Sequence, residues 1–236
     1  MQYCVLLFRS LVFYIVSFVT TCILFLPAFC AIIANKRIML LYISKSWVRF
    51  VLYLLEVICK LKVRATGLEH IQNQPLVIAS KHQSALETLF LYIALIEPKY
   101  VLKSSLQYLP FLGMCFTKLG MIFINRTSPI SAIKTIKSQA KKLLEDGKSI
   151  IIFPEGTRVP YGAKGKYSPG VAAIYESCDF DIVPVSLNSG KYWGRNSIIK
   201  YPGECHINFL PPVPKNLSKN EFMIYLEQSI EGCSGD

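Results

Sequence analysis

The stretch PLVIASKHQSALETLF, residues 75–90, contains the pattern on which the predicted fold depends. Its apolar run, Leu76–Ser80, has the length and composition of a buried strand. A polar loop follows, and then the helix-like segment Ala85–Glu97 begins. Strand, loop and helix in this order indicate a βα unit, in which functional groups gather beyond the carboxyl end of the strand. His82, one of three histidines in the chain, occupies that position.

The same alternation of β-rich and helical segments continues along the rest of the chain. It indicates an α/β domain, residues 62–236, with a mostly parallel mixed sheet flanked by helices. The predicted strands are Lys62–Ala65, Leu76–Ser80, Tyr100–Lys103, Met121–Ile124, Ser149–Phe153, Ile182–Leu187 and Cys205–Leu210. The predicted helices are Ala85–Glu97, Phe111–Leu119, Pro129–Asp146, Val171–Ser177 and Glu221–Ile230.

The first 61 residues have a different composition. No acidic residue precedes Glu56, and Leu11–Ala34 is an uncharged stretch of 24 residues, long enough to span a hydrocarbon core. Ile38–Leu61 is apolar with scattered charges, which is typical of a helix in a membrane interface whose lysines, Lys45 among them, reach lipid headgroups. We therefore predict an N-terminal membrane-associated two-helix element over residues 1–61.

Pro27 interrupts the first apolar segment and allows either a kinked span or a re-entrant helix. Basic residues on both flanks favour the re-entrant form, because both ends then face the cytoplasm. A secretory signal fits less well, because the apolar run exceeds the usual length and no small-x-small cleavage site follows it. The eight cysteines are scattered without CxxC spacing, as in a reducing compartment.

The charge balance narrows the classes of function. The chain has 26 Lys+Arg against 15 Asp+Glu and is 52% hydrophobic. A basic balance suits nucleic acid, a membrane surface or an anionic substrate, and the high hydropathy favours the membrane over nucleic acid. The sequence contains no GxSxG, Walker-type GxxxxGK[ST] or GxGxxG motif. It has no metal-ligand cluster either, so we expect neither a metal nor a cofactor.

His82 and Glu87 allow two interpretations. On one helix their side chains would lie ~140° apart, so they can meet only if His82 lies in the loop and Glu87 in the helix's first turns. Glu87 would then fix the imidazole tautomer and leave the other ring nitrogen free as a base. The alternative is a capping box, in which Ser84 caps the helix and Glu87 is its partner three residues later.

The stretch FPEGTR, residues 153–158, follows a second buried-type strand. Gly156 allows a ligand to approach the backbone closely. Its amide, the amide of Thr157 and the guanidinium of Arg158 could together bind a phosphate. The alternative is an ordinary tight turn with a Glu–Arg pair on the surface.

Two further cations, Lys103 and Arg126, follow other predicted strands. They would lie at the same edge of the sheet as His82 if the strands are parallel. The basic loop VPYGAKGKYSPG, residues 159–170, is a lid, a donor-binding loop or a solvated connection.

These stretches, in order, resemble the four motifs of the 1-acylglycerol-3-phosphate acyltransferase family of membrane glycerolipid enzymes. The family's first motif is a histidine followed five residues later by an acid, usually aspartate, and its third motif is FPEGTR. The resemblance covers roughly residues 62 to 210. The matching positions are His82 and Glu87, then Gly120, Phe123, Ile124 and Arg126, then Phe153–Arg158, then Ile182–Val185.

The resemblance implies acyl transfer from acyl-CoA or acyl carrier protein to the sn-2 hydroxyl of lysophosphatidic acid, 1-acylglycerol 3-phosphate, which gives phosphatidic acid. His82 would take the proton from that hydroxyl and Glu87 would orient His82, without a covalent acyl-enzyme. Glu87 departs from the family pattern, because its extra methylene changes how the acid reaches His82. The residues expected to hold the acceptor's phosphate are Lys103, Arg126, Glu155, Gly156, Thr157 and Arg158.

The resemblance also implies contact with membrane lipids and an α/β domain on the cytoplasmic side of a bacterial inner membrane. Two alternatives remain open. One is an enzyme of the same family that acts on glycerol 3-phosphate or on another lysolipid. The other is a non-catalytic membrane-binding protein with the same fold, against which the intact histidine–acid pair argues.

Overall fold

The computed structural model describes residues 2–232, and within them seven strands form one sheet in the order β1-β7-β6-β2-β5-β3-β4. The five strands from β6 to β4 run parallel, whereas β1 and β7 are parallel to each other and β7 is antiparallel to β6. The mostly parallel mixed sheet expected from the sequence is thereby confirmed. The strands are β1 (Leu61–Thr66), β2 (Val77–Ser80), β3 (Lys99–Lys103), β4 (Ile122–Ile124), β5 (Ile150–Ile152), β6 (Ile182–Leu187) and β7 (Gly203–Phe209).

The central strands are the most apolar because helices cover both of their faces. Every residue of β2, β5 and β6 is buried, so these strands form continuous apolar runs instead of alternating patterns. By contrast, β1 pairs only with β7, at the edge of the sheet, and is only partly buried. The hydrophobic pattern that marks strands in the sequence therefore also marks their position in the sheet.

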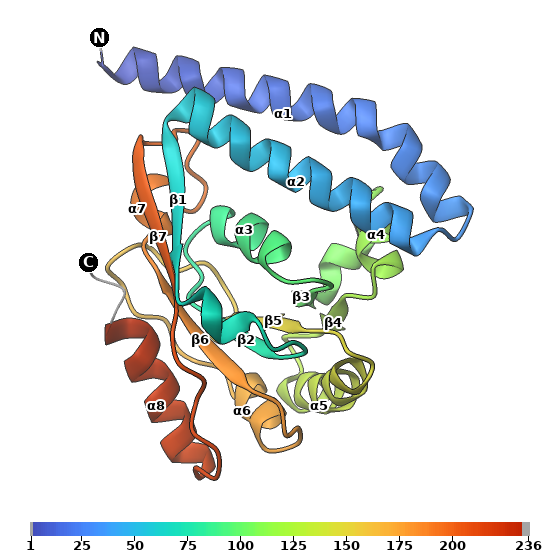
Figure 1. The fold of residues 1–236 in the computed structure, drawn as a ribbon, viewed down its shortest axis with the longest axis vertical. Coiled ribbons are helices and arrows are strands. Elements are labelled where there is room, and N and C mark those ends of the chain that lie inside the picture. Colours follow the sequence, from blue (N-terminus) through green and yellow to red (C-terminus); the bar gives the residue numbers. More distant parts are fainter. Residues whose placement is uncertain (1, 233–236) are drawn as a thin grey trace.

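The helices form layers on the two faces of the sheet (Figure 1). One face is covered by α3 (Leu86–Ala94) and α4 (Leu112–Lys118). The other is covered by α5 (Pro129–Glu145), α6 (Gly170–Tyr175) and α8 (Lys219–Gly232). Short helical turns that the sequence did not predict are η1 (Leu68–Ile71), η2 (Ser104–Tyr108) and α7 (Ser189–Tyr192).

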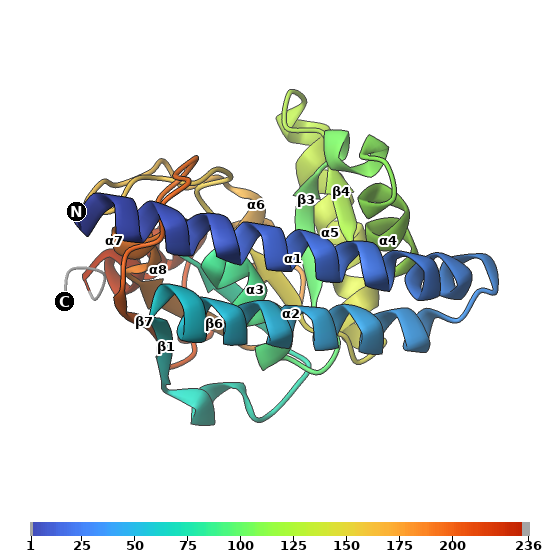
Figure 2. The same ribbon diagram turned by 90° about the horizontal axis from the view of Figure 1, so that it is seen from above.

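Two long helices, α1 (Gln2–Ile33) and α2 (Arg37–Cys59), lie side by side above α3 and α4 (Figures 1 and 2). Both are long and apolar enough to cross a membrane. Their inner faces share one hydrophobic core with the sheet, since Phe13, Ala31 and Leu40 belong to the same buried cluster as Ile78. Near its end α1 bends, and Pro27, which cannot donate a main-chain hydrogen bond, lies in this part.

Lys45 links α2 to the helix layer that contains α3. The side chain is buried, and its ammonium donates to the carbonyl oxygens of Leu95 at 2.5 Å and Ile96 at 2.7 Å, just beyond the end of α3. The expectation that this lysine reaches lipid headgroups was therefore wrong. A lysine on an apolar helix gives the same sequence pattern whether it faces lipid or binds the carbonyls at the end of a neighbouring helix.

Candidate active site

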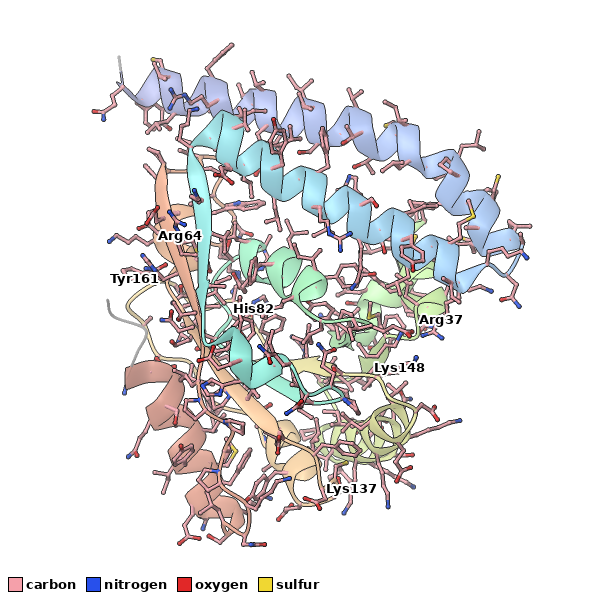
Figure 3. The ribbon with its side chains drawn as sticks, in the orientation of Figure 1. Arg37, Arg64, His82, Lys137, Lys148 and Tyr161 are labelled. Atoms are coloured by element: carbon pink, nitrogen blue, oxygen red, sulfur yellow. The ribbon has the colours of Figure 1, made fainter. Side chains whose placement is uncertain are left out.

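The predicted site residues meet at one edge of the sheet. Because β2 to β6 are parallel, the loops that follow them emerge on the same side. His82 follows β2, Lys103 ends β3, Arg126 follows β4, and the loop FPEGTR, 153–158, follows β5. Figure 3 shows His82 near the centre of the molecule, beneath α3.

His82 is held on its ring and on its main chain. Its Nδ1 lies 2.8 Å from Oε1 of Glu87, and the ring stacks on Phe153 with centroids 3.9 Å apart. The main-chain N–H donates to Oε2 of Glu155 at 3.0 Å, and the carbonyl accepts from the N–H of Val159 at 2.8 Å. The side chain is 14% exposed. With Nδ1 engaged by a carboxylate, Nε2 is the nitrogen left to act on a ligand.

Glu87 is fully buried, and both of its carboxylate oxygens are used. Oε1 accepts from Nδ1 of His82 and from the main-chain N–H groups of Gln83 at 2.9 Å and Ser84 at 2.7 Å. Oε2 accepts from the hydroxyl of Ser189 at 2.6 Å. An ionised carboxylate accepts about four such bonds, so Glu87 can be held in one position by these donors alone.

The structure contains the contact between His82 and Glu87 together with part of the capping box. Ser84 Oγ accepts from the N–H of Leu86 at 3.1 Å, so it closes the start of α3, and Glu87 in turn accepts from the N–H of Ser84. The bond from Ser84 N–H to Glu87 is one half of a capping box. The other half is not formed as predicted, because Ser84 Oγ binds the N–H of Leu86 and not that of Glu87, and α3 begins at Leu86 with Ala85 as its N-cap residue. The same carboxylate also orients His82.

The other titratable groups near Glu87 stay neutral. Burial, followed by the charge of Glu87, raises the pKa of Tyr100 well above 10.0, and its hydroxyl donates to the carbonyl of Thr88 at 2.6 Å. Burial also raises the pKa of Cys205 above 9.0, and Glu87 acts in the same direction. Both groups therefore keep their protons near pH 7.

Four cationic side chains line the same cavity as His82. Lys103, Arg126 and Arg158 were expected there, and Arg195 joins them from the loop after α7. Nη1 of Arg126 donates to the carbonyl of Gly156, and Nη1 of Arg195 lies 3.4 Å from Oγ1 of Thr157 and 3.3 Å from the carbonyl of Arg158. The sequence offered no signal for Arg195, which lies 37 residues after Arg158 in a segment without a recognisable motif.

The turn at FPEGTR differs in detail from the expectation. Gly156 has a positive φ of 66°, which glycine adopts readily. Its N–H, however, donates to the carbonyl of Phe153 at 2.9 Å, so this amide closes the turn and is not aimed at a ligand. The side chains of Thr157 and Arg158 do line the cavity described below.

Glu155 was expected to hold the acceptor's phosphate, but the structure places it elsewhere. Its carboxylate is buried away from the cavity and pairs with Lys81 at 2.8 Å. It also accepts from the main-chain N–H groups of His82 at 3.0 Å and Gly165 at 3.1 Å. A carboxylate repels a phosphate, and both oxygens of this one already accept hydrogen bonds. The geometry therefore corrects the expectation, and Glu155 supports His82.

A cavity of about 710 Å³ begins beside His82 and extends beneath the N-terminal helices. We call the portion at the sheet edge the polar part; it is lined by His82, Lys103, Arg126, Thr157, Arg158 and Arg195. The remainder is the apolar part, with side chains from α1 to α4 and from the residue before α4, which include Leu24, Ala28, Leu40, Ile43, Trp47, Leu89, Tyr92, Phe111 and Phe116. The volume is typical of a ligand-binding site.

The described residues contain no group of three or more His, Cys, Asp or Glu side chains that could hold a metal ion.

Comparison with known proteins gives a family and a fold. Residues 62–188 match the family model Acyltransferase. The chain is 38% identical over 167 residues to a 1-acyl-sn-glycerol-3-phosphate acyltransferase of Pseudomonas aeruginosa, an alignment that covers 70% of this chain and 65% of that protein. It is 29% identical over 157 residues to the 1-acyl-sn-glycerol-3-phosphate acyltransferase alpha of Mus musculus, with 65% of this chain and 55% of that protein covered.

A solved structure shares the fold over nearly the whole length. The crystal structure of the 1-acyl-sn-glycerophosphate acyltransferase PlsC from Thermotoga maritima superposes with a TM-score of 0.76. The superposition covers 99% of this chain and 97% of that one at 19% identity.

Proposed function

The chain belongs to the acyltransferase family, and on that premise we propose that it acylates the sn-2 hydroxyl of 1-acylglycerol 3-phosphate. The acyl donor would be acyl-CoA or acyl carrier protein, and the product would be phosphatidic acid. One observation carries the proposal. A single cavity joins a histidine–acid pair and several cations to a long apolar lining, which suits an acceptor with a hydroxyl, a phosphate and an acyl chain.

In the proposed reaction, Nε2 of His82 removes the proton from the acceptor's hydroxyl. The oxygen attacks the thioester carbon, the carbon–sulfur bond breaks, and the proton on the imidazole passes to the departing thiolate. Glu87 holds Nδ1–H and stabilises the imidazolium that forms between these steps. A positioned base of this kind contributes typically ~10²–10⁴-fold to the rate.

The acceptor's own hydroxyl is the nucleophile in this mechanism, and no covalent acyl-enzyme is needed. Ser84 lies two residues after His82 in the sequence, but its Oγ accepts the N–H of Leu86 at the start of α3. It therefore serves the helix. The phosphate would be held by Arg126, Arg158 and Arg195, because guanidinium groups bind phosphate oxygens bidentately, with Lys103 adding charge.

We propose that α1 and α2 lie in the membrane interface instead of spanning the bilayer. Residues buried against the protein occur near both ends of α1, for example Ser10, Phe13, Ala28 and Ala31, so a spanning α1 would have to leave its own core. Its outer face is strongly apolar and would enter the lipid. Exposed apolar residues of α1 include Phe8, Ile15, Phe18, Ile23 and Leu26.

Such a placement brings the apolar part of the cavity next to the acyl region of the membrane. We place the α/β domain on the cytoplasmic side, which is supported by the basic residues at both ends of the helical pair and by the free cysteines of the described residues.

The test is a panel of acceptors assayed with purified full-length protein in lipid vesicles. Release of free CoA, or of deacylated carrier protein, is measured with lysophosphatidic acid, glycerol 3-phosphate, a lyso-aminolipid and an uncharged monoacylglycerol. We expect lysophosphatidic acid to be preferred, because glycerol 3-phosphate leaves the apolar part empty and monoacylglycerol lacks the phosphate. Faster turnover of glycerol 3-phosphate or the lyso-aminolipid would identify a different acceptor, and absence of thiol release with every pair would indicate a binding protein.

A further inference from the structure

Lys81, directly before His82, is a fully buried cation that the reaction does not use. It is 1% exposed. Its ammonium donates to Oε1 of Glu155 at 2.8 Å, to Oε1 of Glu231 at 2.6 Å and to the carbonyl of Ala163 at 3.1 Å. An ammonium has three N–H groups, so these contacts satisfy it completely. Burying a charge is costly unless it is paired in this way, which makes an accidental arrangement implausible.

The first of these contacts leads to the catalytic histidine. Glu155 uses one carboxylate oxygen for Lys81 and for the N–H of Gly165, and the other for the main-chain N–H of His82. Thus Glu87 fixes the ring of His82, while Glu155 fixes its backbone. Without Lys81, the carboxylate of Glu155 would be buried with no counter-charge next to it.

The second contact leads to the C-terminal helix. Glu231 lies in the last turn of α8 and accepts from Lys81 and from the hydroxyl of Tyr167 at 3.1 Å. Burial and the nearby carboxylates raise the pKa of Tyr167 above 10.0, so its hydroxyl stays protonated and remains a donor.

The loop 159–170 is consequently bonded to the residues of this buried cluster at three points. Its Ala163 carbonyl binds Lys81, its Gly165 N–H binds Glu155, and its Tyr167 hydroxyl binds Glu231. The glycines and lysines of this loop had suggested a free lid or connection. The buried ion cluster instead joins the loop, α8 and the segment after β2 into one unit.

We propose that Lys81 and Glu231 are positioning residues, which act on His82 through Glu155 and the His82 main-chain amide. The inference rests on the proposed function for its kinetic consequence, although the contacts that carry it are independent of the substrate. In physical terms, α8 helps to fix the position of His82, although no residue of α8 lines the cavity or touches the reacting atoms. Displacement of a catalytic group by about 1 Å can cost about 100-fold in rate.

The kinetic test compares Glu231→Ala and Lys81→Met with a matched control, Glu227→Ala, one turn earlier on α8. We expect kcat to fall about ten- to a hundredfold in the two test variants, with the KM for lysophosphatidic acid nearly unchanged, because the phosphate-binding cations are untouched. Glu227→Ala should behave like wild type. The kcat of the double variant Lys81→Met/Glu231→Ala should be only slightly below that of the less active single variant, since both residues act through one cluster.

A second measurement does not depend on turnover. Amide hydrogen exchange, resolved to single residues by mass spectrometry of the full-length protein in detergent micelles, reports directly on the His82 N–H. Exchange at His82 should accelerate at least about tenfold in Glu231→Ala and Lys81→Met, while exchange within α3 and in Glu227→Ala stays as in wild type.

The outcomes separate the two ideas. Unchanged exchange at His82 in both test variants would overturn the positioning role, whether or not the protein is active. Accelerated exchange together with unchanged kcat in an active protein would also overturn it. Accelerated exchange in a protein that transfers no acyl group would support the positioning of His82 and refute the proposed function.

Discussion

The polar and apolar parts of the cavity are built in opposite ways. The polar part comes from the ends of neighbouring parallel strands, where each loop contributes one or two charged side chains and the sheet fixes their spacing. The apolar part lies between helices, and its lining combines side chains of α1 and α2 with side chains of helices that come much later in the sequence. The polar part therefore selects its ligand through fixed hydrogen-bond donors and charges, whereas the apolar part selects it through the shape of the cavity.

This difference suggests a division of function. Changes in the polar part should alter the rate or the recognition of the headgroup. Changes in the apolar part should alter which acyl chains fit, with the chemistry preserved. The predictions that follow test this division, beginning with the largest expected effect.

The largest effect should come from the base itself. We expect His82→Ala to lower kcat by ~10²–10⁴-fold without unfolding the protein, because no other described side chain of the polar part can take the proton near pH 7. Glu87→Gln should lose much of the rate as well, since the imidazolium then lacks its counter-charge. The measurement is release of CoA at saturating lysophosphatidic acid. His70→Ala, in the distant turn η1, is the control, and near-normal turnover of His82→Ala would contradict the mechanism.

The next effect should separate binding from chemistry within the polar part. We expect Arg158→Lys to raise the KM for lysophosphatidic acid roughly ten- to a hundredfold with little change in kcat, because a lysine keeps the charge but loses the bidentate geometry. Arg195→Ala should also weaken the preference for lysophosphatidic acid over monoacylglycerol.

Kinetics with these two acceptors provide the measurement. Arg64→Lys, on the edge strand β1, serves as the matched control because its side chain contacts Glu204 outside the site. If the Arg158 and Arg195 variants keep the full preference for the phosphate form, the phosphate binds elsewhere.

A smaller effect is expected in the apolar part. Ala28 of α1 is buried and lines the cavity, so Ala28→Phe should shorten the space for an acyl chain. Each methylene that no longer fits costs ~0.8 kcal/mol, or roughly fourfold in kcat/KM for the longer chains. The measurement is a series of donors and acceptors of increasing chain length.

Leu26→Phe supplies the control, because it adds bulk to the exposed face of the same helix. A chain-length profile of Ala28→Phe identical to that of wild type would show that chains do not reach this part of the cavity.

The smallest effect concerns the attachment of α1 over the domain. The buried ammonium of Lys200 lies over the rings of Tyr14 at 3.3 Å and Trp193 at 4.6 Å, and burial lowers the pKa of Lys200 from 10.5 to about 7. Between these two values the unfolded chain binds a proton that the folded chain releases, so stability rises with pH across that window. The Tm of wild type should therefore rise between about pH 7 and pH 9 relative to Lys200→Met.

Lys137→Met, which removes an exposed lysine on α5, should follow wild type at each pH. Parallel pH profiles for wild type and Lys200→Met would mean that Lys200 stays charged in the folded protein, held by the aromatic rings.

The strands and the motif residues could be predicted from the sequence because their signals are local. Each central strand is a short apolar run, and His82, Arg126 and FPEGTR each follow such a run directly. Parallel pairing then brings them to one edge without further information. Even the unusual spacing of His82 and Glu87 could be resolved, since only a loop position for the histidine permits contact.

What could not be predicted depends on partners distant in the chain. Ser189 binds Glu87 across 102 residues, and Glu231 binds Lys81 across 150. Neither has a local pattern that distinguishes it from a surface residue. The prediction that Glu155 holds the phosphate failed for the same reason. A recognisable motif indicates that a residue has a role, but it does not show whether the side chain faces the ligand or packs against the protein behind the site.

The pairing of β1 with β7 has a consequence for biosynthesis. The strand that follows the helical pair bonds only to a strand roughly 140 residues later. At about 5–20 residues per second, a ribosome needs about 7 to 28 seconds to make that partner. Throughout this interval α1, α2 and β1 have been synthesised, but β1 has no partner strand. This edge of the sheet is therefore completed late in synthesis, after the apolar helical pair and most of the other strands have left the ribosome.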